Sequence, residues 1–214
     1  MMDLLPVAIE QYCEDHTTEE SPLLYQLNRE THLKAMRPRM ISGKVQGFFL
    51  SMISRLVKPL RILEVGTYTG YATLCLAEGL EQGGTVDTIE KDEEQRDIIL
   101  RFFSRSEYSD RIHLHIGDAL DILPQLDKIW DLVLIDADKK QYIDYFEWIL
   151  PRLRKGGIVL VDNVLWSGKV VEEVKANDKD TRAIMAFNDY IQQNTLVRNG
   201  LLPFRDGVML IEKL

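Results

Sequence analysis

The sequence predicts an α/β protein with a doubly wound, mostly parallel sheet of seven strands, helices on both faces, an antiparallel C-terminal edge and a helical N-terminal extension. From Arg61 onward, short apolar runs alternate with segments of helical pattern, as in βαβ units with right-handed crossovers. Several of these runs contain no polar residue, as expected of parallel strands that are buried on both faces.

Five strands are predicted from Arg61 onward, followed by a different pattern at the end. The strands are Arg61–Gly66, Thr85–Glu90, Arg111–Gly117, Asp131–Asp136 and Gly157–Asn163. The helices between them include Tyr71–Glu81, Glu93–Ser104 and Tyr142–Leu153. Leu196–Phe204 and Val208–Lys213 flank the turn Asp206-Gly207, which predicts two further strands that add an antiparallel edge to the sheet.

The chain before Arg61 is predicted to be helical, with candidate helices Val7–Glu14, Pro22–Met36 and Gly43–Val57. The link before the third helix breaks the pattern and predicts a loop, with Ser42 as a candidate N-cap. The polar segment Lys169–Asp180 predicts a surface loop or a short helix. We therefore expect one domain over residues 1–214, made of a helical cap (1–60) and a cofactor-binding α/β core (61–214).

Composition narrows the class of protein. The 214 residues are 45% hydrophobic and 28% charged, which is ordinary for a globular protein. The net charge of −8 disfavours broad contact with a phosphate backbone, so we expect no nucleic-acid partner. No window approaches the apolar length of a membrane span, and no signal peptide is evident, so a cytoplasmic location without membrane contact is expected. Cys13 and Cys75 indicate neither a disulfide framework nor a metal knuckle.

Two apolar runs end abruptly in oxygen-bearing side chains. One run is followed by Asp136-Ala137-Asp138 and the other by Asp162-Asn163. Ligands of open parallel sheets bind outside the carboxyl ends of the strands, which is where these residues fall. Two carboxylates and an amide oxygen at that place suit a hard divalent cation. The alternative is that the acids are helix N-caps or turn formers.

Three other strand ends favour an adenosine ligand. The first strand leads into Glu64-Val65-Gly66-Thr67-Tyr68-Thr69-Gly70, whose glycines let a ligand approach the backbone at a helix N-terminus. Glu90 ends the second strand, where it can accept hydrogen bonds from both ribose hydroxyls. Gly117-Asp118-Ala119 ends the third, near where an adenine ring would lie. The spacing Gly-x-x-x-Gly does not meet the dinucleotide fingerprint, which disfavours a nicotinamide-dependent oxidoreductase.

Longer stretches resemble the metal-dependent O-methyltransferases, which include the caffeoyl-coenzyme A O-methyltransferases, their bacterial relatives and, more distantly, catechol O-methyltransferase. The similar stretches are Met40–Met52, Ile62–Tyr71, Asp136–Lys139, Asp162–Gly168 and Leu202–Gly207. The match extends from about Pro22 to the C-terminus. It implies the Rossmann-like fold of class I methyltransferases and methyl transfer from S-adenosylmethionine to one hydroxyl of a catechol-like phenolic small molecule.

The resemblance also implies roles for single residues. Contacts to S-adenosylmethionine would come from Ser42, Glu64, Gly66, Thr67, Ala72, Glu90, Ala119 and Asp138. The metal, Mg²⁺ before Mn²⁺ or Ca²⁺, would be bound by Asp136, Asp162 and Asn163, and Lys139 would act with Asp136 in catalysis as the general base. The plant enzymes carry Asn at the position of Ser167, near their substrate, so an acyl-coenzyme A acceptor is not implied.

The implied chemistry is consistent with the residues. A catechol can chelate Mg²⁺, the cation lowers the pKa of the bound hydroxyl, and Lys139 could lose its own proton readily and accept that of the hydroxyl. The alternative for Lys139 is an ion pair with Asp138 at the surface. Two different functions would also suit this fold, namely a non-catalytic cofactor-binding protein and a nucleic-acid methyltransferase. The metal-ligand set and Lys139 disfavour a non-catalytic protein, which would not need them. The net negative charge of the chain disfavours a nucleic-acid methyltransferase.

The apolar residues of the N-terminal extension predict a contact surface. Leu23, Leu24 and Leu27 lie in a helical pattern outside the α/β core, and an exposed stripe of this kind usually finds a partner. We therefore expect this segment to contribute to a homodimer contact and to the mouth of the substrate site. Packing onto its own domain is the alternative, and only the family resemblance favours the dimer.

Overall fold

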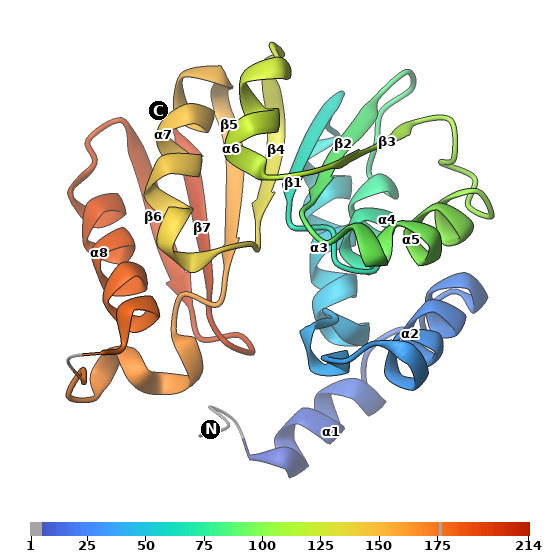
Figure 1. Ribbon diagram of the computed structural model, residues 1–214, viewed down its shortest axis with the longest axis horizontal. Coiled ribbons are helices and arrows are strands. Elements are labelled where there is room, and N and C mark those ends of the chain that lie inside the picture. Colours follow the sequence, from blue (N-terminus) through green and yellow to red (C-terminus); the bar gives the residue numbers. More distant parts are fainter. Residues whose placement is uncertain (1–5, 176) are drawn as a thin grey trace.

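The computed structural model describes residues 6–175 and 177–214, and its centre is a seven-stranded sheet of order β3-β2-β1-β4-β5-β7-β6. The strands are β1 (Arg61–Val65), β2 (Thr85–Glu90), β3 (Ile112–Ile116), β4 (Trp130–Ile135), β5 (Leu153–Asp162), β6 (Val197–Leu202) and β7 (Val208–Lys213). Strand β7 runs antiparallel to β5 and β6, and the other pairs are parallel. The predicted doubly wound sheet with an antiparallel C-terminal edge is confirmed (Figure 1).

Helices cover both faces of the sheet (Figure 1). They are α1 (Val7–Asp15), α2 (Pro22–Lys34), α3 (Gly43–Val57), α4 (Tyr71–Ala77), α5 (Arg96–Phe103), α6 (Ala119–Ile122), α7 (Tyr142–Arg152) and α8 (Lys179–Gln193). Short 3₁₀ segments are η1 (Pro38–Met40), η2 (Glu93–Gln95), η3 (Leu123–Gln125), η4 (Lys139–Gln141) and η5 (Trp166–Val171).

Alternate strand residues supply two hydrophobic cores. Ile62 and Leu134 belong to the core that includes buried residues of α2, α3, α4 and α5. Leu63 and Val133 belong to the core that includes residues of α6, α7 and α8. Successive side chains of a strand point to opposite faces, so a strand covered on both sides must be apolar at nearly every position. This explains the unbroken apolar runs of the sequence.

Several details differ from the sequence predictions. Strand β5 begins at Leu153 and not at Gly157, and α5 begins at Arg96 and not at Glu93, after the 3₁₀ segment η2. Helix α8 was not predicted, although Ile184, Phe187 and Ile191 form its buried stripe. The segment 169–180, which was predicted to be a surface loop or short helix, includes the end of η5 and the start of α8. Residue 176 lies outside the described residues. Helix α4 ends at Ala77, not Glu81, and a Cβ at Gly79 would lie 2.2 Å from the α3 backbone. Ser42 precedes α3, but its side chain makes no capping hydrogen bond.

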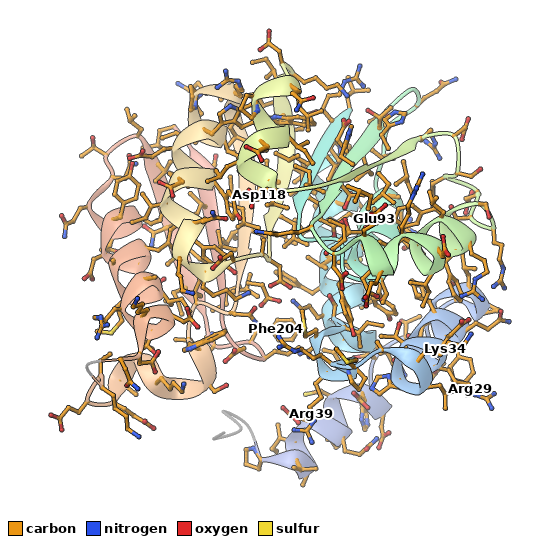
Figure 2. The ribbon with its side chains drawn as sticks, viewed as in Figure 1. Arg29, Lys34, Arg39, Glu93, Asp118 and Phe204 are labelled. Atoms are coloured by element: carbon orange, nitrogen blue, oxygen red, sulfur yellow. The ribbon has the colours of Figure 1, made fainter. Side chains whose placement is uncertain are left out.

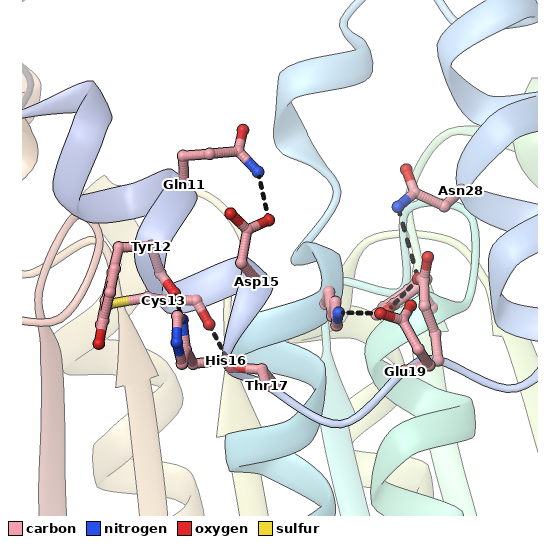
Figure 3. A network of polar contacts seen from close by, with 11 residues as sticks. Gln11, Tyr12, Cys13, Asp15, His16, Thr17, Glu19 and Asn28 are labelled. Carbon is pink, nitrogen blue, oxygen red and sulfur yellow. Dashed lines mark hydrogen bonds and ion pairs between the residues drawn. The ribbon is translucent and has the colours of Figure 1, made fainter.

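Helices α2 and α3 pack onto the core of their own chain, whereas α1 has no buried residue. Leu24 and Leu27 are buried against this core. For these two leucines, packing onto their own domain, which was the alternative to a dimer contact, is therefore correct. The predicted homodimer therefore no longer rests on them and stays a prediction. Polar contacts attach the link between α1 and α2, because Glu19 pairs with Lys44 at 2.7 Å and Asn28 donates to Glu20 at 3.5 Å (Figure 3). The first five residues of the predicted cap lie outside the described residues.

Among the described helices, none has both the length and the apolar composition that crossing a membrane requires.

Candidate active site

The carboxyl ends of β1 and β4 lie in contact, with Gly66 after β1 packed against Asp136 after β4. The backbone N–H of Asp136 donates to the carbonyl of Val65 at 2.8 Å, which aligns the two strand ends. Gly66 follows β1 with a φ of 104°, and a Cβ at this position would lie 2.0 Å from the Asp136 carbonyl oxygen. Only glycine can adopt this conformation at this separation, so the turn after β1 lies directly against the end of β4.

A hollow opens between this turn and the start of α3. Four of the residues that sequence analysis assigned to the cofactor line it, and Asp136, which was assigned to the metal, lines it too. These residues are Ser42, Gly66, Thr67, Ala72 and Asp136. Met40 and Tyr68 complete the rim, and the Tyr68 hydroxyl donates to the Arg37 carbonyl at 2.9 Å. The fold thus brings residues from three separate segments to one opening.

Glu64, on β1 two residues before Gly66, is a fully buried acid. Its Oε2 accepts hydrogen bonds from the hydroxyls of Thr73 and Thr88, whereas its Oε1 has no partner. Burial raises the pKa of Glu64 to about 8, the nearby carboxylates of Asp136 and Glu90 add to the rise, and the two threonine bonds oppose it. At neutral pH the carboxyl is therefore largely protonated.

Glu90 closes the turn after β1 from the neighbouring strand. Its carboxylate accepts hydrogen bonds from the backbone N–H of Tyr68 at 2.6 Å and of Asp92 at 2.8 Å. Burial raises the pKa of this carboxyl, and the two backbone bonds partly offset the rise. These contacts hold the Glu90 side chain at the end of β2, beside the glycine turn.

Four predicted cofactor residues do not line the hollow: Glu64 and Glu90, described above, and Ala119 and Asp138. Ala119 is a buried residue at the start of α6, and Asp138 accepts a hydrogen bond from the Lys140 N–H at 3.1 Å, as an N-cap of η4. Asp118 precedes α6 and pairs with Lys91 at 2.7 Å, which joins the segments after β2 and β3 (Figure 2). A ligand reaching Ala119 and Asp138 would have to extend from the hollow along the strand ends.

The predicted metal ligands Asp162 and Asn163 end β5, next to β4. Asp162 is buried, and its Oδ1 and Oδ2 accept hydrogen bonds from the Asn163 N–H at 2.8 Å and the Gln46 Nε2 at 2.6 Å. Burial raises the pKa of Asp162, and the charge of Asp136 raises it further. Asn163 has a φ of 62°, a strained conformation that turns the chain sharply after the strand.

Lys139 forms an ion pair with Asp136, with Nζ 2.9 Å from Oδ1. The alternative prediction, a pair with Asp138, is therefore wrong. Burial lowers the pKa of Lys139, but the Asp136 carboxylate and the Tyr142 hydroxyl outweigh it, so the net pKa is raised. The expectation that Lys139 loses its proton readily does not hold for this pair. Its ammonium lies over the Tyr142 and Trp166 rings, at 5.4 and 5.9 Å from their centroids.

Three further residues contact this site without having been assigned a role from the sequence. Gln46 contacts Asp162, Arg205 contacts Gln46 at 2.9 Å, and the Tyr142 hydroxyl donates to the Asp162 carbonyl at 3.0 Å. Gln46 and Arg205 lie 116 and 43 positions from Asp162, so no local pattern links them to it. Their neighbours in the sequence did carry a signal, because both residues fall within the stretches that resemble a known family.

Comparison with known proteins identifies the family. The family model described as O-methyltransferase matches residues 14–214. The chain belongs to the O-methyltransferase family. Among its members, the chain is similar to a catechol O-methyltransferase from Niastella koreensis, with 34% identity over 79% of this chain and 78% of that protein. It is also similar to a caffeoyl-CoA O-methyltransferase from Populus kitakamiensis, with 35% identity over 79% and 76% of the two chains.

A solved structure in this family agrees with the fold. The O-methyltransferase from Bacillus cereus, determined in complex with SAH, superposes with a TM-score of 0.86 at 31% identity, and the match covers 97% of each chain. The expected Rossmann-like methyltransferase fold and the expected O-methyltransferase activity are thereby confirmed.

Proposed function

We propose that this O-methyltransferase uses S-adenosylmethionine and a divalent cation to methylate one hydroxyl of a catechol-like phenol. The names of the Niastella and Populus relatives support the acceptor class, and the SAH bound by the Bacillus protein, which is the demethylated form of S-adenosylmethionine, supports the cofactor. One observation carries the proposal. Asp136 both lines the hollow at the glycine turn and contacts Lys139, so a methyl donor in the hollow would lie beside the acid–lysine pair.

The electrostatics of the hollow fit a cationic cofactor. Asp136 and Glu90 are close enough to raise the pKa of Glu64, and Oε1 of Glu64 is buried without a hydrogen-bond partner. S-adenosylmethionine carries a sulfonium and an ammonium group, which the carboxylates of Asp136 and Glu90 favour. The pyrophosphate of a nicotinamide cofactor would meet repulsion at the same place, which disfavours the oxidoreductase alternative.

The acid–acid–amide set fits a divalent cation by its chemistry. Asp136 and Asp162 are near enough for the charge of one to raise the pKa of the other, and Asn163 adds an amide oxygen. Oxygen donors of this kind suit Mg²⁺. Among the described residues, no three His, Cys, Asp or Glu side chains are placed to hold a metal ion, and in this proposal Asn163 supplies the third ligand.

The chain's own residues then have distinct tasks. A divalent cation bound by Asp136, Asp162 and Asn163 would lower the pKa of an adjacent phenol hydroxyl and would offset the Asp136 charge that raises the pKa of Lys139. In this proposal the Lys139 ammonium first loses its proton to solvent, and the neutral amine then takes up the phenol proton, while the phenol oxygen forms a bond to the methyl carbon and the carbon–sulfur bond breaks. Trp166 and Tyr142 lie against the Lys139 ammonium and restrict its position.

The test is formation of SAH from S-adenosylmethionine with a panel of catechols, flavonoids and hydroxycinnamoyl esters. We expect turnover of at least one catechol with Mg²⁺, loss of turnover after chelation, and recovery when Mg²⁺ is added back. Turnover that persists in a thoroughly chelated Asp162→Ala protein would overturn the metal requirement. Calorimetric binding of S-adenosylmethionine without turnover of any phenol in the panel would instead favour the non-catalytic alternative.

A further inference from the structure

A buried amide connects the C-terminal hairpin to the acid at the end of β5. Gln46, on the first turns of α3, is 3% exposed and donates from Nε2 to Oδ2 of Asp162 at 2.6 Å. Its Oε1 accepts a hydrogen bond from Nη1 of Arg205 at 2.9 Å. We propose that Gln46 is a positioning residue for the Asp162 carboxylate and that Arg205 acts through Gln46. This inference rests on the cation site of the proposed function.

The orientation of the Gln46 amide is fixed by its two partners. An ionised carboxylate can only accept hydrogen bonds, and a guanidinium can only donate them. The NH₂ group of Gln46 must therefore face Asp162, and its carbonyl must face Arg205. Flipping the amide would place two acceptors together at Asp162 and two donors together at Arg205. Arg205 thus sets which end of the amide Asp162 meets, without touching Asp162 itself.

The consequence for Asp162 is a fixed carboxylate plane. Oδ1 is held by the Asn163 N–H and Oδ2 by Gln46, so rotation about the last side-chain bond would break two hydrogen bonds. Each carboxylate oxygen has two lone-pair directions, which leaves one on each for a cation. A ligand that is already oriented loses less freedom when it binds a metal, which is how hydrogen-bonding partners of ligands raise metal affinity.

Arg205 is itself held in place by the turn between β6 and β7. It adopts a φ of 50°, and its guanidinium also donates to the Ile41 carbonyl at 3.3 Å. Phe204 packs on Phe49 of α3 with ring centroids 5.4 Å apart. A strained backbone that persists needs such surroundings to maintain it. The hairpin, the start of α3 and the end of β5 therefore form one connected unit around Gln46.

The experiment is a Mn²⁺ titration of the full chain, with free Mn²⁺ measured by electron paramagnetic resonance. For Gln46→Leu, which keeps the volume but removes both hydrogen bonds, we expect affinity to fall about 10- to 100-fold, the usual range for a partner of a metal ligand. For Arg205→Met we expect a smaller loss. The double variant should bind as weakly as Gln46→Leu alone, because Arg205 has no separate route to the cation.

Ser51→Ala is the matched control, since Ser51 is a buried polar residue of the same helix whose hydroxyl donates to Glu78 at 2.6 Å, away from the site. It should bind Mn²⁺ like the wild type, and thermal melting identifies any variant that fails to fold. If Gln46→Leu does not fold, Arg205→Met carries the test.

The outcomes separate this inference from the proposed function. A wild-type protein that binds Mn²⁺ no better than Asp162→Asn would overturn the cation site itself. If the wild type binds Mn²⁺ and Gln46→Leu matches Ser51→Ala, the site stands and the positioning role is wrong. Additive losses in the double variant would overturn the claim that Arg205 acts through Gln46, and an Arg205→Met protein equal to the control would do the same.

Discussion

Nζ of Lys139 lies 2.9 Å from Oδ1 of Asp136, three residues earlier in the chain. The ion pair spans the end of β4 and the first residue of η4, so a candidate metal ligand and a candidate base belong to one short segment. The same carboxylate raises the pKa of the lysine, which couples proton transfer by Lys139 to the charge near Asp136. Substitutions of the two residues should therefore have different effects.

Lys139→Met should lower the turnover number about 100-fold, the lower end of the range for a general base, because the cation would already acidify the phenol. Affinity for S-adenosylmethionine, measured by calorimetry, should stay nearly unchanged. The exposed neighbour Lys140, which pairs with Asp180 at 3.4 Å, provides the control Lys140→Met. Wild-type turnover by the Lys139→Met enzyme from pH 7 to 9 would show that Lys139 is not the base.

Asp136→Ala should weaken both cation binding and substrate binding. It removes a carboxylate from the proposed cation site and leaves the Lys139 ammonium without its partner. We expect Mn²⁺ affinity and the KM for the catechol to worsen together, since the chelated acceptor loses its anchor. Asp144→Ala removes an exposed carboxylate from the nearby helix α7 and should change neither quantity. A variant with normal Mn²⁺ affinity would remove Asp136 from the set of metal ligands.

Glu90→Ala should weaken S-adenosylmethionine binding by about 1–3 kcal/mol, the scale of charge-assisted hydrogen bonds to the ribose. The carboxylate also holds the Tyr68 N–H at 2.6 Å, so the turn should become more mobile. Calorimetry measures the affinity, and Glu93→Ala, which removes an exposed carboxylate three residues later, is the charge-matched control. Equal affinities in the two variants would contradict a role for Glu90 in the cofactor site.

Attachment of α2 to α5 should depend on pH. Arg101 donates from Nη1 and Nη2 to the Glu30 carboxylate at 3.1 and 2.6 Å, and these bonds lower the pKa of Glu30 to about 2, with a further contribution from Lys34. Because the pKa is lowered on folding, the pair stabilises the protein above pH 4.5, and this contribution is lost as the pH falls towards 2.

Urea unfolding of the wild type and of Glu30→Gln checks this expectation. The difference in their free energies of unfolding should be at most about 1 kcal/mol at pH 6, since the pair is close to the surface, and should shrink steadily below about pH 4.5. A difference that stays constant down to about pH 3 would show that the charge of Glu30 is not what stabilises this contact.

The sheet could be predicted because local pattern and tertiary environment agree in it. Gly66 and Glu90 were found as strand-end residues, since a strand buried on both faces ends visibly where polar residues begin. Helix α8 was missed because its buried positions, such as Phe187, are spaced among charged residues that continue the polar pattern of the segment before it. The prediction that Ser42 caps α3 was wrong: its side chain makes no hydrogen bond to the first turn of the helix.

The candidate site divides in the same way. Asp136 and Asp162 follow apolar runs and could be recognised from the sequence. Gln46 and Arg205 reach the site only through contacts between distant parts of the chain, which no local pattern predicts. The partner of Lys139 depended on where its side chain points: Asp138 is adjacent in sequence, yet its carboxylate accepts from the Lys140 N–H as the N-cap of η4. Side-chain direction over one turn is beyond what spacing alone resolves.

The hairpin contact of Arg205 also bears on when the site can form during synthesis. Arg205 follows Gln46 by 159 positions, which a ribosome translating 5–20 residues per second needs roughly 8–32 s to add. Once Asp162 has been added, the glycine turn and both acids are present in the nascent chain, while the amide that orients Asp162 lacks its own partner for a further 43 residues, or roughly 2–9 s. We expect polypeptides released before the hairpin to lack a fully oriented acid, so that translation of the hairpin determines when a nascent molecule becomes an enzyme.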